Sequence, residues 1–229
     1  GELGTALSDL NQGLQLAPPS VELRVARCAV HAALGNDAAA TQDCAAALAV
    51  EPFNGLALEQ RGLLRQRAGD RLGAEADFRE AVRYDPGAYQ ANYYLGLFAL
   101  QERRPAEAIP PLTAAIDAFP GYGLAYAARG VAYRLTEQWQ QALADLEQAV
   151  VLVPEDRYNY YELGLVLQNL ADLAYEGGNI ERAETLYEDA GEAYTTYLNS
   201  SPPSSDALTQ AQIGLEYVQQ ALTVIRASN

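Results

Sequence analysis

The sequence is poor in several residue types that carry chemistry. It has one histidine (His31) and two cysteines, and it lacks methionine and lysine, so all 15 basic residues are arginines. A single histidine excludes a metal site built from several histidines and acid–base catalysis by a histidine pair. We therefore expect His31 to be a packed, hydrogen-bonded core residue. We predict no catalytic residues, no metal and no cofactor, and hence a protein that is not an enzyme.

Long apolar runs are also missing. No stretch approaches the ~18 apolar residues that a helix needs to cross a bilayer, so we expect no membrane span. Hydrophobic residues nevertheless make up 49% of the chain. That share is enough for a sizeable core and argues against wholesale disorder.

Basic residues are scarce beside acidic ones, and the formal net charge is −15. Residues 1–134 hold 12 arginines and 15 acidic residues, whereas residues 135–229 hold 3 arginines and 15 acidic residues. Binding of nucleic acid through its phosphates needs a clustered basic surface. We therefore expect no nucleic-acid partner, and we expect the second segment to be strongly acidic.

What the sequence does contain is an internal repeat with a 34-residue period. Four rows of residues keep this step in a common register over five periods, which excludes coincidence. The rows are Pro18, Pro52, Pro86, Pro120 and Pro154; Ala6, Ala40, Ala74, Ala108 and Ala142; Cys28, Gly62, Gly96, Gly130 and Gly164; and Gly13, Ala47, Ala81, Ala115 and Ala149.

Each period holds two stretches with helical spacing of apolar residues, for example 112–119 and 142–153. A turn pattern such as Gly69-Asp70 separates the two stretches, and the proline ends the second because it cannot continue the hydrogen-bond ladder. Small residues where the helices cross allow their backbones to approach closely. The spacing therefore predicts an all-α fold of antiparallel helix hairpins.

This pattern resembles the tetratricopeptide repeat family. In the unit at 123–156 the matching residues are Tyr126, Gly130, Tyr133, Ala142, Leu146, Ala149 and Pro154. The unit at 21–54 departs from the pattern, because Arg27 and Cys28 replace its Leu-Gly pair. The resemblance implies a right-handed superhelical α-solenoid of stacked hairpins, and it implies little about function.

The repeat register predicts the organisation of the whole chain. Residues 1–20 form a half repeat with a second helix only, and full repeats follow at 21–54, 55–88, 89–122 and 123–156. In the next repeat, 157–203, the interval from Gly164 to the turn at Gly178 is twice that from Gly62 to Gly69. We therefore expect both of its helices to be longer by about two turns. Residues 204–229 form a C-terminal helix that resembles a first helix.

Cys28 and Cys44 lie in one predicted hairpin, on rows that both face the helix contact. Two interpretations remain open. They are buried thiols that act as small apolar residues, or they form a disulfide that pins the hairpin. A disulfide implies a secreted, cell-surface or periplasmic protein, and free thiols imply a cytoplasmic one.

Two further motifs each allow a functional interpretation and one that assigns them no function. Asn199 opens a glycosylation sequon, Asn-Ser-Ser, which matters only in a secreted protein. A stripe of carboxylates on the lengthened second helix either binds a cation such as calcium or is a solvated helix face, which we favour. The stripe is Glu181, Glu184, Glu188 and Glu192.

The resemblance implies that the first helices line a concave groove, and we call its positions the first-helix face. They are Val25, Ala29, Glu59, Leu63, Tyr93, Leu97, Ala127, Val131, Arg134, Tyr158, Tyr161, Leu165 and Asn169. An apolar, tyrosine-rich groove suits a helix or an extended apolar peptide. We therefore predict a non-enzymatic scaffold that binds a protein or peptide partner.

The two ends predict an alternative function. The lone second helix presents a row, Ala6, Leu10 and Gly13, that a first helix covers elsewhere, and repeats need neighbours to bury such faces. The C-terminal helix carries the first-helix residues Ile213, Gly214 and Tyr217. If this helix of one copy completes the N-terminal half repeat of the next, the contact is head-to-tail and generates a ring or a filament.

Overall fold

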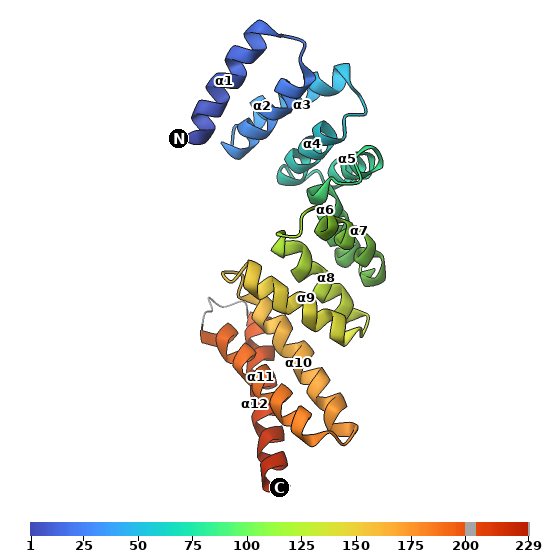
Figure 1. Ribbon diagram of the computed structural model, residues 1–229, viewed down its shortest axis with the longest axis vertical. Coiled ribbons are helices and arrows are strands. Elements are labelled where there is room, and N and C mark those ends of the chain that lie inside the picture. Colours follow the sequence, from blue (N-terminus) through green and yellow to red (C-terminus); the bar gives the residue numbers. More distant parts are fainter. Residues whose placement is uncertain (200–204, 229) are drawn as a thin grey trace. The chain divides into compact units, whose positions relative to one another are not determined.

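The computed structural model describes residues 1–199 and 205–228, and all regular secondary structure within them is helical (Figure 1). The helices are α1 (Glu2–Leu16), α2 (Val21–Ala33), α3 (Asp37–Val50), α4 (Gly55–Arg67), α5 (Arg71–Tyr84), α6 (Tyr89–Gln101), α7 (Pro105–Ala118), α8 (Gly123–Leu135), α9 (Trp139–Leu152), α10 (Tyr158–Glu176), α11 (Ile180–Asn199) and α12 (Ser205–Ser228). The expectation of an all-α fold of helix hairpins is confirmed.

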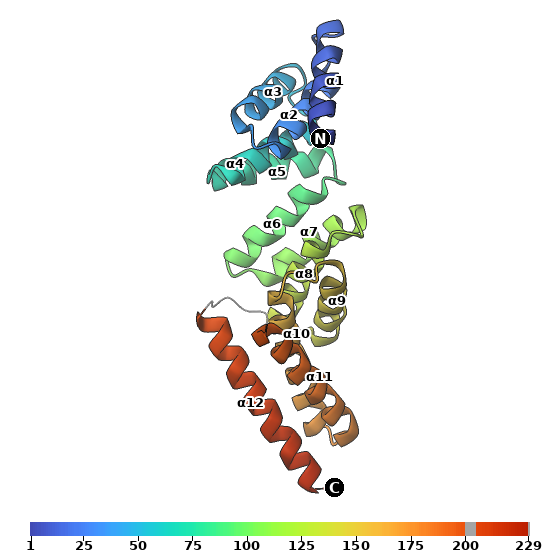
Figure 2. The ribbon, with the colours of Figure 1, turned by 90° about the vertical axis from the view of Figure 1, so that its left-hand side faces the viewer.

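The chain divides into two compact units. Unit 1 comprises Gly1–Glu102 and Pro110–Phe119, and unit 2 comprises Arg103–Ile109 and Pro120–Asn229. In unit 1, α2 packs against α3 and α4 against α5 as hairpins, and α1 packs against α2. In unit 2, α8 pairs with α9 and α10 with α11, while α12 lies along α11 and also touches α10 (Figures 1 and 2).

The glycine row marks the point where the two helices of a hairpin touch. A Cβ added to Gly62 would lie 2.6 Å from Cε1 of Phe78, and one added to Gly130 would lie 2.8 Å from Cγ of Leu146. Each bulky second-helix side chain therefore fills the space that only glycine leaves open. Phe78 and Leu146 are fully buried as a result.

The first hairpin joins the same two positions covalently. Cys28 takes the place of the glycine and Cys44 that of the bulky residue, and the two form a disulfide with a Cα–Cα distance of 5.6 Å. Both residues are fully buried. Of the two interpretations of this cysteine pair, the structure contains the disulfide.

The turns inside the hairpins keep the same period. Gly35 and Gly69 adopt positive φ angles of 76° and 81°, and the equivalent residues Arg103 and Glu137 adopt 58° and 59°. Left-handed backbone is free of steric cost for glycine and costly for other residues. The third and fourth hairpins therefore keep the turn geometry without the residue that favours it.

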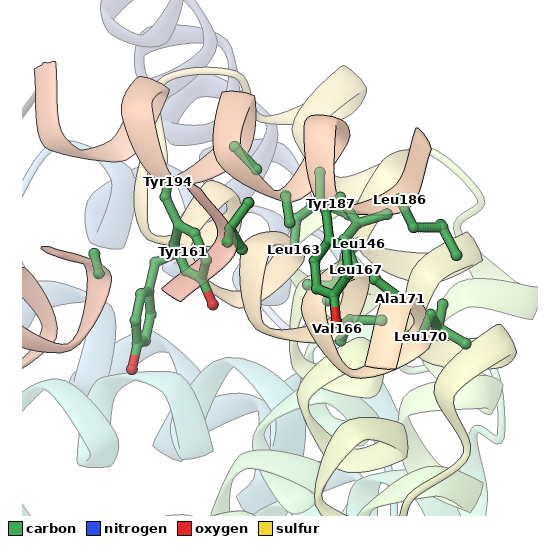
Figure 3. Close-up of a cluster of buried hydrophobic side chains, with 14 of the residues drawn as sticks. Leu146, Tyr161, Leu163, Val166, Leu167, Leu170, Ala171, Leu186, Tyr187 and Tyr194 are labelled. Carbon is green, nitrogen blue, oxygen red and sulfur yellow. The ribbon is translucent and has the colours of Figure 1, made fainter. Parts of the chain in front are cut away.

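The hairpin α10–α11 is longer than those before it. Its helices have 19 and 20 residues, where α8 and α9 have 13 and 14. The extra turns enlarge the core of unit 2, in which Leu163, Leu167 and Tyr187 pack between α10 and α11 (Figure 3).

Candidate functional site

The first-helix face of unit 1 is carried by α2, α4 and α6, which touch one another in sequence. Two of its residues, Val25 and Glu59, are buried, at 2% and 4% exposure. The remaining ones are half-buried and present apolar or aromatic surface. These are Ala29, Leu63, Tyr93 and Leu97.

Glu59 ties α4 to α6. Its carboxylate accepts a hydrogen bond of 2.9 Å from the backbone amide of Ala91. Burial raises the pKa of the Glu59 carboxyl, and the hydrogen bonds from the backbone amides of Ala91 and Gln90 oppose that rise. Glu59 thus holds two neighbouring first helices together rather than facing a partner.

In unit 2 the first-helix face is carried by α8 and α10. Tyr158 is exposed and Tyr161 is buried, with 5.4 Å between their ring centroids. Arg134 donates from Nε to Oε2 of the buried Glu162 over 2.6 Å, which fixes α8 against α10. The other residues of the face here are half-buried: Ala127, Val131, Leu165 and Asn169.

The α10 surface continues beyond Asn169 into a notch between α10, α11 and α12. Asp172 Oδ1 accepts hydrogen bonds from the hydroxyls of Tyr187 (2.5 Å) and Tyr217 (2.9 Å). Beside them lies a cavity of about 220 Å³, which we call the tyrosine notch. Its lining residues are Tyr175, Tyr187, Tyr217, Gln220, Ala221, Val224 and Ile225.

A family model described as tetratricopeptide repeat matches residues 59–123. These residues carry tetratricopeptide repeats. A search of curated protein sequences gives no match.

Solved structures of tetratricopeptide-repeat proteins share this fold. MamA 41-end from Desulfovibrio magneticus RS-1 is 22% identical, with a TM-score of 0.56 over 79% of this chain and 94% of MamA. YrrB is 15% identical, with a TM-score of 0.61 over 83% of this chain and 96% of YrrB. The matching chain of the Cut9–Hcn1 structure is 16% identical, with a TM-score of 0.62 over 95% of this chain and 40% of that chain. At these identities the likeness concerns the fold alone.

Three of the helix hairpins contain an ion pair that the sequence analysis did not predict. Arg27 pairs with Asp43, Arg61 with Asp77 and Arg129 with Asp145, each across one hairpin. The aspartates are buried. The signal was present in the sequence, because these arginines and aspartates keep the repeat register. The Arg27–Asp43 ion pair therefore joins α2 and α3 in addition to the disulfide.

The residues expected in self-association occupy different environments. Ala6, Leu10 and Gly13 of α1 are half-buried, whereas the corresponding residues of α3 are fully buried. At the other end, a Cβ added to Gly214 would lie 2.6 Å from Cζ of Tyr194. Gly214 is therefore covered by its own chain. Its neighbours Ile213 and Tyr217 are 53% and 44% exposed.

The structure also places three further sequence features, which are His31, the sequon at Asn199 and the acidic stripe. His31 is half-buried, and its Nδ1 is buried without a hydrogen-bond partner among the described residues, so the bond we expected is not made at this atom. Asn199 is exposed at the end of α11, and the other two sequon residues lie outside the described residues. Glu184 and Glu188 of the acidic stripe pair with Arg226 of α12, the former over 2.7 Å.

The residues that the structure describes include neither a membrane-spanning helix nor a metal-binding cluster. None of their helices combines the length and the apolarity needed to cross a membrane. They contain no group of three or more His, Cys, Asp or Glu side chains suitably placed to hold a metal ion.

Proposed function

We propose that this chain is a non-enzymatic scaffold whose first-helix face binds a peptide or helix of a partner protein. One observation carries the proposal: neighbouring first helices leave Leu63, Tyr93 and Leu97 half-buried, although the bulky second-helix residues are fully buried. Apolar and tyrosine side chains of this kind supply contact area at low entropic cost. The YrrB structure, which is described as having an unusual peptide-binding site, supports the same use of the fold.

A matched pair of substitutions tests this proposal. Peptides selected from a random display library on the intact chain would be measured against Leu63→Asp on α4 and against Leu72→Asp on α5. Leu72 is 81% exposed on a second helix and serves as the control. We expect Leu63→Asp to weaken binding at least tenfold and Leu72→Asp to leave it unchanged, with circular dichroism showing that both fold. Equal affinity for the two variants would contradict the proposal.

Self-association is a second candidate, favoured by the uncovered row on α1. The row that is fully buried in α3 as Ala40, Cys44 and Ala47 is half-buried in α1, which leaves apolar surface that a second copy can cover. Because Gly214 packs on Tyr194, the covering helix would use the exposed edge of α12 at Ile213 and Tyr217.

Light scattering at increasing concentration tests self-association. We expect a mass that rises with concentration and that Leu10→Asp abolishes. Leu16→Asp serves as the control because Leu16 is 83% exposed on the same helix, outside the row. A wild-type chain that stays monomeric at tens of micromolar, or a Leu10→Asp variant that still assembles, would rule this candidate out.

We also propose that the chain resides in an oxidising compartment, because its disulfide persists only where thiols are not kept reduced. A thiol count on denatured, unreduced protein from its native source tests this. We expect no reactive thiol, and two thiols per chain would contradict the proposal.

A further inference from the structure

The tyrosine notch lies on the line of the first-helix face. Along α10, Leu165, Asn169 and Asp172 follow one another at steps of four and three residues, which places them on one side of the helix. The last turns of α10, which the shorter first helices lack, therefore extend this face. Tyr175 lines the notch, and Asp172 lies next to the lining, where it accepts the hydrogen bonds from Tyr187 and Tyr217.

Asp172 has no basic partner among the residues that the structure describes. Both of its hydrogen bonds arrive at Oδ1, and no arginine of the described residues forms an ion pair with it. Residues 135–229 contain 3 arginines against 15 acidic residues, so the surrounding field also favours a cation. Burial raises the pKa of the Tyr187 and Tyr217 hydroxyls, and the Asp172 carboxylate adds to this effect. Both hydroxyls therefore remain donors to that carboxylate.

The walls of the notch suit one kind of cation. A guanidinium is planar, stacks on aromatic rings and donates N–H groups to a carboxylate, whereas an ammonium is a compact, strongly hydrated charge. Tyr175 and Tyr217 are each 44% exposed, so their rings are accessible beside the cavity. Ala221 and Val224 line the same cavity and offer apolar contact to the methylene stem of an arginine.

We propose that the tyrosine notch receives an arginine side chain of the partner peptide, with the guanidinium paired to Asp172 and lying against the tyrosine rings. The inference rests on the proposed function, because it assigns a chemistry to the α10 part of the first-helix face. The partner is then a segment that combines apolar residues for the half-buried positions with an arginine for the notch.

A small probe tests the notch without requiring a known partner. Acetyl-arginine methylamide would be titrated into the intact, isotope-labelled chain and followed by amide NMR shifts, with acetyl-citrulline methylamide as the neutral analogue of similar shape. We expect saturable shifts gathered on residues 172–176 and 213–225 for arginine, and none that saturate for citrulline. Equal responses to the two probes, or shifts spread over every acidic surface, would overturn the proposal.

Two variants distinguish arginine binding at the notch from general attraction to the negative charge of this segment. Asp172→Asn and Glu181→Gln each remove one charge from the same acidic segment, and Glu181 is exposed on α11 away from the cavity lining. We expect at least a tenfold loss of arginine affinity for the first and less than twofold for the second. Equal losses would overturn the proposal. Val224→Trp, at a 55% exposed position, fills the notch without a charge change, so we expect it to abolish arginine binding. This variant replaces Asp172→Asn as the test if Asp172→Asn does not fold, and unchanged arginine binding would then overturn the proposal.

The failure of this inference is distinguishable from failure of the proposed function. A selected peptide that loses affinity with Leu63→Asp and is indifferent to Asp172→Asn would overturn the notch and leave the scaffold standing. A chain that binds the arginine probe at the notch and selects no peptide would keep the arginine site and overturn the scaffold.

Discussion

Arg129 and Asp145 form a two-point ion pair across the α8–α9 hairpin, with 2.7 Å from Nε to Oδ2 and 2.8 Å from Nη2 to Oδ1. The corresponding positions one repeat earlier hold Leu95 and Pro111. Both polar partners are therefore replaced in that hairpin. As a result, no carboxylate is buried at this position without a guanidinium partner. Breaking one half of a buried pair costs more than replacing both halves.

This relationship predicts a non-additive mutant pair. Arg129→Leu leaves the Asp145 carboxylate buried and unpaired, so we expect it to lower the free energy of unfolding by roughly 3 kcal/mol. The double variant with Asp145→Ala should recover at least half of that loss. Denaturation followed by the fluorescence of Trp139, the only tryptophan, would report on unit 2.

The exposed pair Arg79–Glu75 supplies the control, since Arg79→Leu at a 66% exposed position should cost less than about 0.5 kcal/mol. Because Arg79 lies in unit 1, the unfolding of this variant would be followed by circular dichroism. Additive losses for Arg129→Leu and Asp145→Ala would contradict the account of the pair.

The hairpin architecture could be predicted from the sequence because a fixed period repeats each helix contact in the same register. Gly62, Gly96 and Gly130 indicated the close crossings directly. The tyrosine notch could not be predicted, since Asp172, Tyr187 and Tyr217 come from three helices. Their meeting depends on how the longer hairpin packs against α12. The sequence predicts a role in self-association for Tyr217, whereas the structure shows its hydroxyl bonded to Asp172, 45 positions earlier.

The turn at Glu137 predicts a stabilising substitution. Glu137 has a φ of 59°, where Gly35 and Gly69 occupy the equivalent turns. Glu137→Gly removes the steric cost of left-handed backbone, so we expect a gain of about 1 kcal/mol in the free energy of unfolding. The reciprocal Gly69→Ala should destabilise by a similar amount. A loss of stability in Glu137→Gly, measured through Trp139, would show that the turn carries no such cost.

Glu59 predicts a pH dependence of stability. Its pKa is raised by burial, so the folded state binds more protons than the unfolded state just above the ordinary glutamate pKa. Its contribution to stability is therefore largest at low pH and declines as the pH rises through the raised folded-state pKa. We expect Glu59→Gln, which keeps an acceptor for the Ala91 amide, to gain stability relative to the wild type across that window. Parallel stability curves for the two proteins would contradict this assignment.

The disulfide predicts that its positions accept the glycine-and-bulky pair of the other hairpins. Cys28→Ala with Cys44→Ala removes the cross-link and should cost about 3 kcal/mol. Cys28→Gly with Cys44→Leu reproduces the Gly130–Leu146 arrangement and should recover part of that loss. Thermal unfolding followed by circular dichroism would compare the two. A glycine–leucine variant that is no better than the alanine one would mean that this hairpin depends on the bridge itself.

The central claim is that partner peptides bind the first helices. Hydrogen–deuterium exchange of the intact chain, with and without a saturating selected peptide, tests it most directly because exchange reports on each helix separately. We expect slowed exchange in α4, α6 and α10 and unchanged exchange in α5 and α9. Protection confined to the second helices, or no protection at saturation, would contradict the account.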